Sequence, residues 1–163
     1  MSRAAPTGMV VASIEDFEVW KKAKALWGIV EPLLARRGFL QNLGLRDQIR
    51  EALDSITANM EEGFEQSTDR AFARYLYTSK GSAAEVRGRL GLAYERKFIT
   101  AAELQNVQEL EKELQRMLNG LIRYLLASNR KDRHSGRRNT KPRPKLDEVK
   151  PRTDANDSRN DDQ

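Results

Sequence analysis

Residues 45–60 carry apolar side chains at three- and four-residue intervals, the spacing of an α-helix that buries one face. The side chains of a strand alternate every two residues, so this pattern indicates a helix. The chain is therefore expected to build its core from helices, starting from this stripe. The stripe consists of Leu45, Ile49, Ala52, Leu53, Ile56 and Met60.

Two polar stripes accompany the apolar one on the same predicted helix. One carries Gln48, Ser55, Asn59 and Glu62, and the other carries Asp47, Glu51, Asp54, Glu61 and Glu65. A helix with three different faces is expected to have three kinds of neighbour. The acidic face is expected to be either solvated or a contact for a partner.

Three further segments repeat the helical spacing. The first begins near Ser13, a predicted N-cap, and should end or kink at Pro32. Gly38 and Gly44 are expected to bracket the connection that follows. The predicted buried face of this segment consists of Phe17, Trp20, Ala23, Trp27 and Val30.

The next segment begins after a cap at Ser67 or Thr68. Gly81 lies in its middle and lowers helix stability by about 1 kcal/mol relative to alanine, so we expect another group to approach this backbone closely. Glu85 and Arg89 have the spacing of a surface ion pair. The predicted buried face consists of Phe72, Tyr75, Leu76, Ser79, Ala83, Val86, Leu90 and Ala93.

The last segment begins at Thr100, which forms a capping box with Glu103. Its apolar residues continue to about Ser128: Leu104, Val107, Leu110, Leu114, Met117, Leu118, Leu121, Ile122 and Leu125. Four amphipathic helices with short connections predict an all-α protein, an antiparallel up-down-up-down four-helix bundle. Residues 1–12 are expected to be a disordered lead, residues 13–128 the bundle, and residues 129–163 a disordered tail.

Net charge differs between the predicted bundle and the predicted tail. Residues 1–128 carry 18 Lys/Arg and 17 Asp/Glu, whereas residues 129–152 carry 10 Lys/Arg and 3 Asp/Glu, and the last residues are acidic. Such a basic segment is typical of proteins that bind the phosphates of nucleic acid, and the affinity of this binding falls steeply as the salt concentration rises. No aromatic residue interleaves these cations, so base stacking is not expected from the tail. The alternative is a tail that only keeps the protein soluble.

Two groups of cations are therefore candidate nucleic-acid contacts. The tail group is Arg130, Lys131, Arg133, Arg137, Arg138, Lys141, Arg143 and Lys145. The second group, Arg70, Arg74, Arg87 and Arg89, lies with Arg96 and Lys97 on the helix that follows Thr68, and could instead meet an acidic stripe of another subunit.

The composition argues against several kinds of chemistry. The chain has no Cys, and its single histidine, His134, lies in the predicted tail, so neither a di-iron core nor a Ser-His or Cys-His nucleophile is expected. We predict no enzyme activity, no metal and no cofactor, with Glu62 and Glu85 as the remaining candidates for interior carboxylates. The longest apolar run near the start is too short for a signal peptide or membrane span, so we expect a cytoplasmic protein without a membrane partner.

A polar network is the predicted role of the uncharged stripe and its neighbours. Such a network would fix the register of the helices or form a subunit contact. Its members are Gln48, Ser55, Asn59, Glu62, Ser82 and Glu85.

Several short sequences together resemble the four-helix-bundle family first described from intervening sequences of 23S rRNA. They are Asp47-Gln48-Ile49-Arg50, Ser55-Ile56, Asn59, Glu62-Gly63, Phe72-Ala73-Arg74-Tyr75-Leu76 and Gly81-Ser82-Ala83-Ala84-Glu85, with Phe17 to Ala23 similar to the opening helix. The resemblance covers about residues 14–126. It departs at Glu51, Thr57 and Glu61, where relatives commonly show a basic residue, a proline and a small apolar residue.

The resemblance implies a homo-oligomer, often a pentameric ring, and kinship in fold to retroelement accessory proteins that bind a reverse transcriptase and nucleic acid. We therefore expect a non-enzymatic, oligomeric nucleic-acid-binding protein, with RNA favoured over DNA and a reverse transcriptase as a further partner. Several tails on one ring would bind together more tightly than one. The alternative is a ring-shaped protein-interaction scaffold without nucleic-acid binding.

Overall fold

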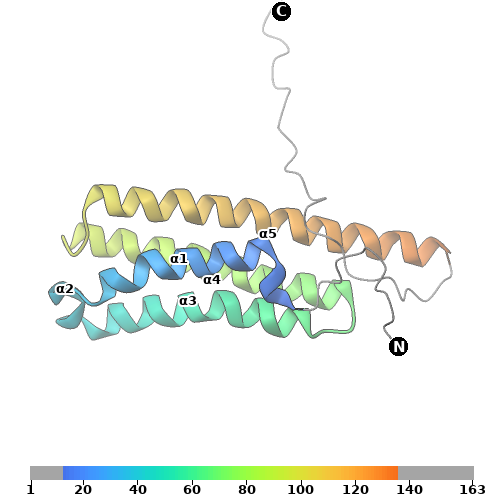
Figure 1. The fold of residues 1–163 in the computed structure, drawn as a ribbon, viewed down its shortest axis with the longest axis horizontal. Coiled ribbons are helices and arrows are strands. Elements are labelled where there is room, and N and C mark those ends of the chain that lie inside the picture. The colour runs from blue at the N-terminus through green and yellow to red at the C-terminus, as the bar shows by residue number, and fades with distance from the viewer. Residues whose placement is uncertain (1–12, 136–163) are drawn as a thin grey trace, which may run out of the picture.

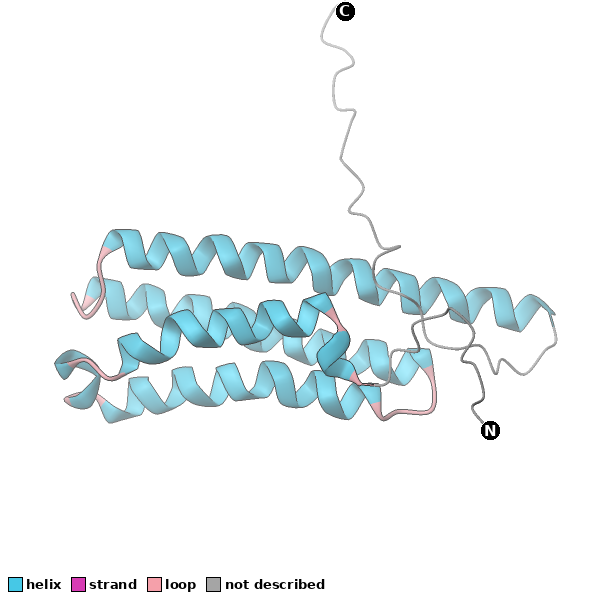
Figure 2. Cartoon of the chain, viewed as in Figure 1, coloured by secondary structure: helices cyan, strands magenta, loops and turns pink. Residues whose placement is uncertain are grey.

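The structure, a computed structural model, describes residues 13–135, and the side chains of residues 13–127. This part of the chain is all-α and contains no strand, which confirms the predicted fold class (Figures 1 and 2). The elements are the 3-10 helix η1 (Ile14–Asp16) and the helices α1 (Glu18–Leu34), α2 (Arg37–Leu40), α3 (Leu43–Phe64), α4 (Asp69–Glu95) and α5 (Ala101–Ser135). The lead and the rest of the tail lie outside the described residues.

The four long helices lie side by side, and each packs against two others (Figure 1). Side-chain contacts fix their directions, because residue numbers fall on one helix as they rise on its neighbour. Neighbouring long helices are therefore antiparallel. For α3 and α4 the contacts are Ser55–Ser82 and Glu62–Tyr75, and for α4 and α5 they are Lys80–Asn119 and Arg87–Glu111. For α1 and α3 they are Trp20–Glu61 and Arg50–Glu31. For α1 and α5 the contact is Lys22–Glu113, and Arg36, two residues after the end of α1, meets Glu103 of α5.

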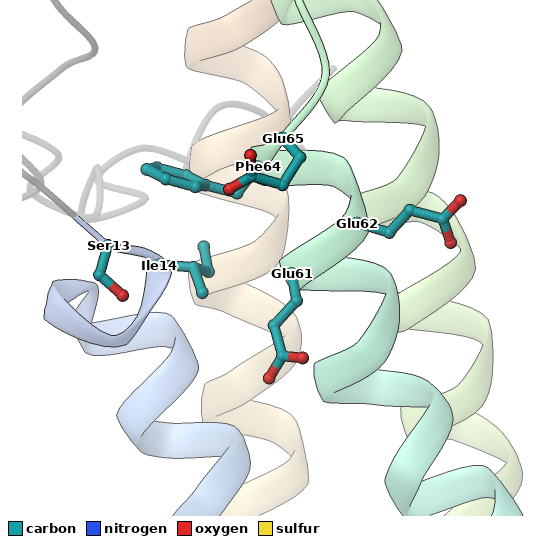
Figure 3. Close-up of a pocket in the computed structure, with 6 residues that line it drawn as sticks. All are labelled: Ser13, Ile14, Glu61, Glu62, Phe64 and Glu65. Atoms are coloured by element: carbon teal, nitrogen blue, oxygen red, sulfur yellow. The ribbon is translucent and has the colours of Figure 1, made fainter.

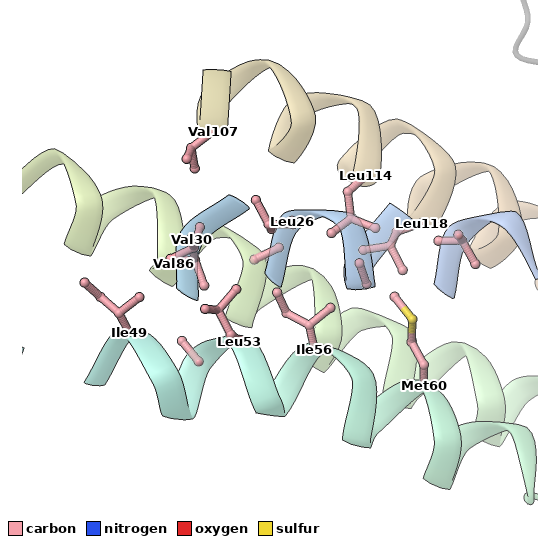
Figure 4. Close-up of a cluster of buried hydrophobic side chains, with 14 of the residues drawn as sticks. Leu26, Val30, Ile49, Leu53, Ile56, Met60, Val86, Val107, Leu114 and Leu118 are labelled. Carbon is pink, nitrogen blue, oxygen red and sulfur yellow. The ribbon is translucent and has the colours of Figure 1, made fainter. Parts of the chain in front are cut away.

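The predicted stripe of α3 forms the centre of the core. All six of its apolar residues are buried, and they face the apolar side chains of the other long helices (Figure 4). The predicted faces of α4 and α5 are buried in large part as well. Tyr75, Leu104, Leu110 and Met117 are only half-buried, because they lie at the edges of these faces.

The buried face of α1 differs in part from the prediction: Phe17, Ala23 and Val30 are buried as predicted, but the two tryptophans are not. Val19 and Leu26 have no exposed surface, whereas Trp20 and Trp27 are half-buried. The indole Nε1 of Trp20 donates to Glu61 (3.4 Å), so this ring lies at the edge of the core with its polar atom directed outward. Apolar residues recur at helical spacing on two neighbouring faces of α1, one with Trp20 and Trp27 and one with Val19 and Leu26. Packing against the other helices buries the face with the aliphatic residues.

The ends of the helices follow local capping chemistry. Thr68 accepts from the N–H of Ala71 (3.2 Å), and Thr100 and Glu103 form the predicted capping box, with distances of 2.8 and 3.3 Å. Asn42 caps α3, which therefore begins at Leu43 and includes Gly44. Ser13 caps η1 rather than the long helix, because Phe17 is extended between the two.

Two helix boundaries differ from the predicted ones. α1 continues past Pro32 to Leu34, and the short helix α2, which contains Gly38, follows directly. α5 continues past Ser128 to Ser135, so the expected boundary of the tail lies inside a helix. Residues 129–135 contain no Gly or Pro, and extending an existing helix requires no new nucleation.

The ion pair between Arg36, in the connection from α1 to α2, and Glu103 of α5 predicts a pH dependence of stability. The guanidinium of Arg36, whose Nη1 lies 2.9 Å from Oε2 of Glu103, and the N–H of Thr100 lower the pKa of Glu103 from 4.5 to about 2. The unfolded chain therefore binds more protons between pH 4.5 and about 2, so stability falls as the pH falls through this window. We expect the urea midpoint to drop on acidification across it, and to drop less in Glu103→Gln.

The control for this measurement is Glu109→Gln on the same helix, which should lose as much stability on acidification as the wild type. Equal acid losses in the wild type and Glu103→Gln would contradict the prediction.

Candidate functional site

An exposed stripe of small residues runs along the outer face of α4. We call the α4 stripe the residues Tyr77, Gly81, Ala84, Gly88 and Gly91, whose alternating spacing of four and three places them on one side of the helix. Tyr77 is 53% exposed, Gly81 and Gly88 are exposed, and Ala84 and Gly91 are half-buried. The stripe therefore offers an almost flat backbone surface with one large ring.

The glycines of this stripe have no packing role within the subunit. A Cβ atom added at Gly81, Gly88 or Gly91 would meet no heavy atom within 4 Å. The expected close approach to Gly81 is thus wrong for a single chain. Each glycine inside a helix nevertheless lowers stability by roughly 1 kcal/mol relative to alanine. The stripe is available for the close approach of another molecule.

The four predicted contact arginines of α4 do not share one face. Arg70 and Arg74 are exposed on the side of the α4 stripe. Arg87 and Arg89 lie on opposite flanks of it, and each pairs with a carboxylate: Nη1 of Arg87 is 3.3 Å from Glu111, and Nη2 of Arg89 is 3.3 Å from Glu85. The last of these is the predicted surface ion pair. Arg70 and Arg74 are therefore the better placed to meet phosphates.

Three of the six predicted network residues lie together between α3 and α4. The hydroxyls of Ser55 and Ser82 are 2.8 Å apart, and the amide of Asn59 donates to the carbonyl of Ser55 (2.7 Å). Gln48 is exposed on α3.

The two candidates for interior carboxylates are exposed, which corrects that expectation. Glu85 pairs with Arg89, as described above. Glu62 accepts a hydrogen bond from the hydroxyl of Tyr75 (2.8 Å), which raises the pKa of Tyr75.

The buried carboxylate of the bundle is Glu111, which the sequence reasoning missed. Only 1% of this residue is exposed. It pairs with Arg87 and accepts from Nε2 of Gln115 (2.9 Å), which also donates to the carbonyl of Lys80 (2.9 Å). The ammonium of Lys80 in turn donates to Asn119 (2.8 Å). The signal was present, because Glu111 lies four residues after Val107 and three before Leu114 in the apolar stripe.

A pocket of about 330 Å³ lies where η1 meets the end of α3 (Figure 3). Ile14 and Phe64 provide apolar walls, and Ser13, Glu61, Glu62 and Glu65 complete the lining. The carboxylates of Glu61 and Glu62 point in different directions, so they do not form a pair that shares a proton (Figure 3). Within residues 13–127, no group of three or more acidic or histidine side chains is placed to hold a metal ion.

The tail cations fall into two sets. The backbone of Arg130, Lys131 and Arg133 belongs to α5, whose end extends past the other helices (Figure 1). The others, Arg137, Arg138, Lys141, Arg143 and Lys145, lie outside the described residues. None of the described helices is long and apolar enough to cross a membrane.

Fold and surfaces together define a class of protein: an all-α bundle whose distinctive features are a glycine-rich outer helix face and clustered surface charge. The sequence model of the family described as 23S rRNA-intervening sequence protein matches residues 15–120, and the chain belongs to this family. The resemblance inferred from the short sequences is thereby confirmed. No curated protein matches the chain.

Proposed function

We propose that this protein is a non-enzymatic, cytoplasmic homo-oligomer that binds nucleic acid, RNA in preference to DNA. The name of its family refers to rRNA, which supports a role connected with RNA. By the resemblance described above, five subunits form the ring, and a reverse transcriptase is a further partner.

The observation that carries this proposal is the concentration of eight Lys/Arg in residues 130–145, beginning on the projecting end of α5. Each phosphate that a cation neutralises releases counterions, so a short basic segment binds weakly and with strong salt dependence. Several such segments on one oligomer act at high effective concentration. Self-association is therefore what makes the segment useful.

The α4 stripe is our candidate for the subunit contact. Small residues allow two helix backbones to approach closely, and Tyr77 supplies a large apolar surface beside them. This accounts for three glycines that weaken the helix and serve no packing purpose within the subunit.

Deleting residues 136–163 tests the nucleic-acid proposal. The deletion removes five of the eight cations, so we expect the slope of log affinity against log salt to fall in magnitude by about 3 to 5 for a labelled RNA hairpin. Affinity at about 50 mM salt should fall by at least about 100-fold. The molar mass of the deletion variant should equal that of the wild-type subunit assembly, less the deleted residues.

The alternative function, a protein-interaction scaffold without nucleic-acid binding, predicts a different result in the same experiment. The acidic stripe of α3 is exposed along its length and is open to a protein partner. An oligomeric wild type that binds no RNA at low salt would favour that alternative. An unchanged affinity and salt slope after the deletion would show that the tail is not the contact.

A further inference from the structure

The short segments at the two ends of the bundle differ in charge. Residues 35–46 and 96–102, at the end that holds α2 and the α4–α5 turn, contain five Lys/Arg and no Asp/Glu. Residues 13–18 and 61–69, at the opposite end, contain seven Asp/Glu and no Lys/Arg (Figure 1). The first end therefore presents a group of cations with no carboxylate in the same segments, which favours contact with a polyanion.

The cations of this end are brought together by aromatic packing. The rings of Phe39 and Phe98 meet edge to face with centroids 5.4 Å apart, and a Cβ atom on Gly38 would lie 2.6 Å from the ring of Phe98. Since Arg37 precedes Gly38 and Lys97 precedes Phe98, the two cationic residues lie at one corner. We call Arg37, Arg96 and Lys97 the basic corner.

All three residues of the basic corner are exposed, and none forms an ion pair with a carboxylate of the described chain. Arg36, by contrast, is engaged by Glu103. The corner thus holds three cations that are free to meet an anion.

Lys97 also occupies a position that favours glycine. Its φ is 62°, the only positive value of a non-glycine residue in the described chain. Its N–H bonds the carbonyl of Tyr94 (2.8 Å) and the N–H of Phe98 bonds that of Ala93 (2.9 Å), the Schellman arrangement that commonly ends a helix at glycine. A side chain in this conformation lowers the folding equilibrium constant by a factor of about 5 to 30.

The helix dipole does not explain this lysine. A cation at the end of α4 interacts favourably with the carbonyl groups there, but Arg96 already supplies one at the C-cap. A strained residue that carries an unpaired charge is better explained by a function of that charge.

We propose that the basic corner is a second RNA-binding surface, which contacts the phosphate backbone independently of the tail. This inference rests on the proposed nucleic-acid function and adds a contact site to it. The described end of α5, from which the tail continues, and the basic corner lie at opposite ends of the bundle (Figure 1). One subunit would therefore contact RNA at two places.

The test compares two triple variants of the full chain on a labelled RNA hairpin across a salt series. In Arg37→Gln/Arg96→Gln/Lys97→Gln we expect the salt slope to fall in magnitude by about 2 to 3 and the affinity at about 50 mM salt to fall at least about tenfold. The control, Lys112→Gln/Arg116→Gln/Arg123→Gln, removes the same charge from exposed positions of α5 and should change both much less.

A second variant separates binding from folding. Lys97→Gly should raise the urea midpoint, because glycine adopts the left-handed conformation freely, and should weaken RNA binding. A more stable variant with full RNA affinity would overturn the proposal.

The remaining outcomes are distinguishable. Equal losses in the two triple variants would overturn the basic corner alone. A wild type that binds no RNA would overturn the proposed function and this inference together.

A second experiment measures binding to anionic lipid vesicles, because Leu40 and Leu43 are exposed near the basic corner. Loss of vesicle binding with RNA binding unchanged would assign the corner to a membrane.

Discussion

Replacing Gly81 and Gly88 by leucine is expected to convert the proposed oligomer into folded monomers. Nothing in the subunit lies within 4 Å of a Cβ at either position, so the larger side chains fit the isolated chain. Each leucine should also raise the stability of the monomer by about 0.5–1 kcal/mol, because glycine is a poor helix former. Against a second helix in close contact, however, the same side chains would separate the two backbones.

Two measurements follow from this. Light scattering should give the mass of one chain, and RNA affinity should fall by about 100-fold or more as the tails cease to act together. The matched control is Gly28→Leu/Gly44→Leu, at two exposed helix glycines that also have no neighbour within 4 Å. The control should keep the wild-type mass. A Gly81/Gly88 variant that keeps it too would remove the α4 stripe as the subunit contact.

Gly63→Ala is expected to have the opposite effect on stability. A Cβ atom there would lie 2.7 Å from both Cδ2 of Phe72 and Cβ of Tyr75. The Cβ of Tyr75 cannot move without its backbone, so α3 and α4 would have to separate locally. We expect the free energy of unfolding to fall by about 1–3 kcal/mol.

The comparison for this variant is Gly28→Ala, which adds the same methyl group to a helix where no atom opposes it. It should raise the free energy of unfolding by about 0.5–1 kcal/mol. Urea titrations of the two variants give both values. If Gly63→Ala were as stable as the wild type, the contact between these two helices would have to be looser than described.

A structural feature of this protein could be predicted from the sequence when the interaction that forms it joins residues close together along the chain. The sequence predicted a cap at Ser67 or Thr68 and another at Thr100, because a hydroxyl and an N–H three residues later belong to one turn, and the structure selects Thr68 of the first two. The choice between Trp20 and Val19 for the core was not predictable in this way. It depends on which side of α1 faces α3 and α5, and a single helix contains no such information.

The candidate sites also differ in whether they depend on neighbours along the chain or on residues brought together by folding. The basic segment of residues 130–145 is visible in the sequence, because consecutive charges need no fold to be close together. Glu111 could have been suspected from its place in an apolar stripe, but its partner Arg87 comes from another helix. The basic corner was not foreseen, since Arg37 and Lys97 are sixty residues apart and meet only where Phe39 packs on Phe98.

The sequence by itself determined that this chain forms amphipathic helices, where α4 and α5 begin, and that it carries a strongly basic segment near its end. Helix periodicity, caps and charge are properties of neighbours along the chain, so folding cannot change them. Only the tertiary structure decided which face of α1 is buried, that the glycines of α4 face outward, and that the residues of the basic corner gather at one end. Each of these depends on how one helix is rotated and aligned against the next, which is decided by packing between residues far apart in the sequence.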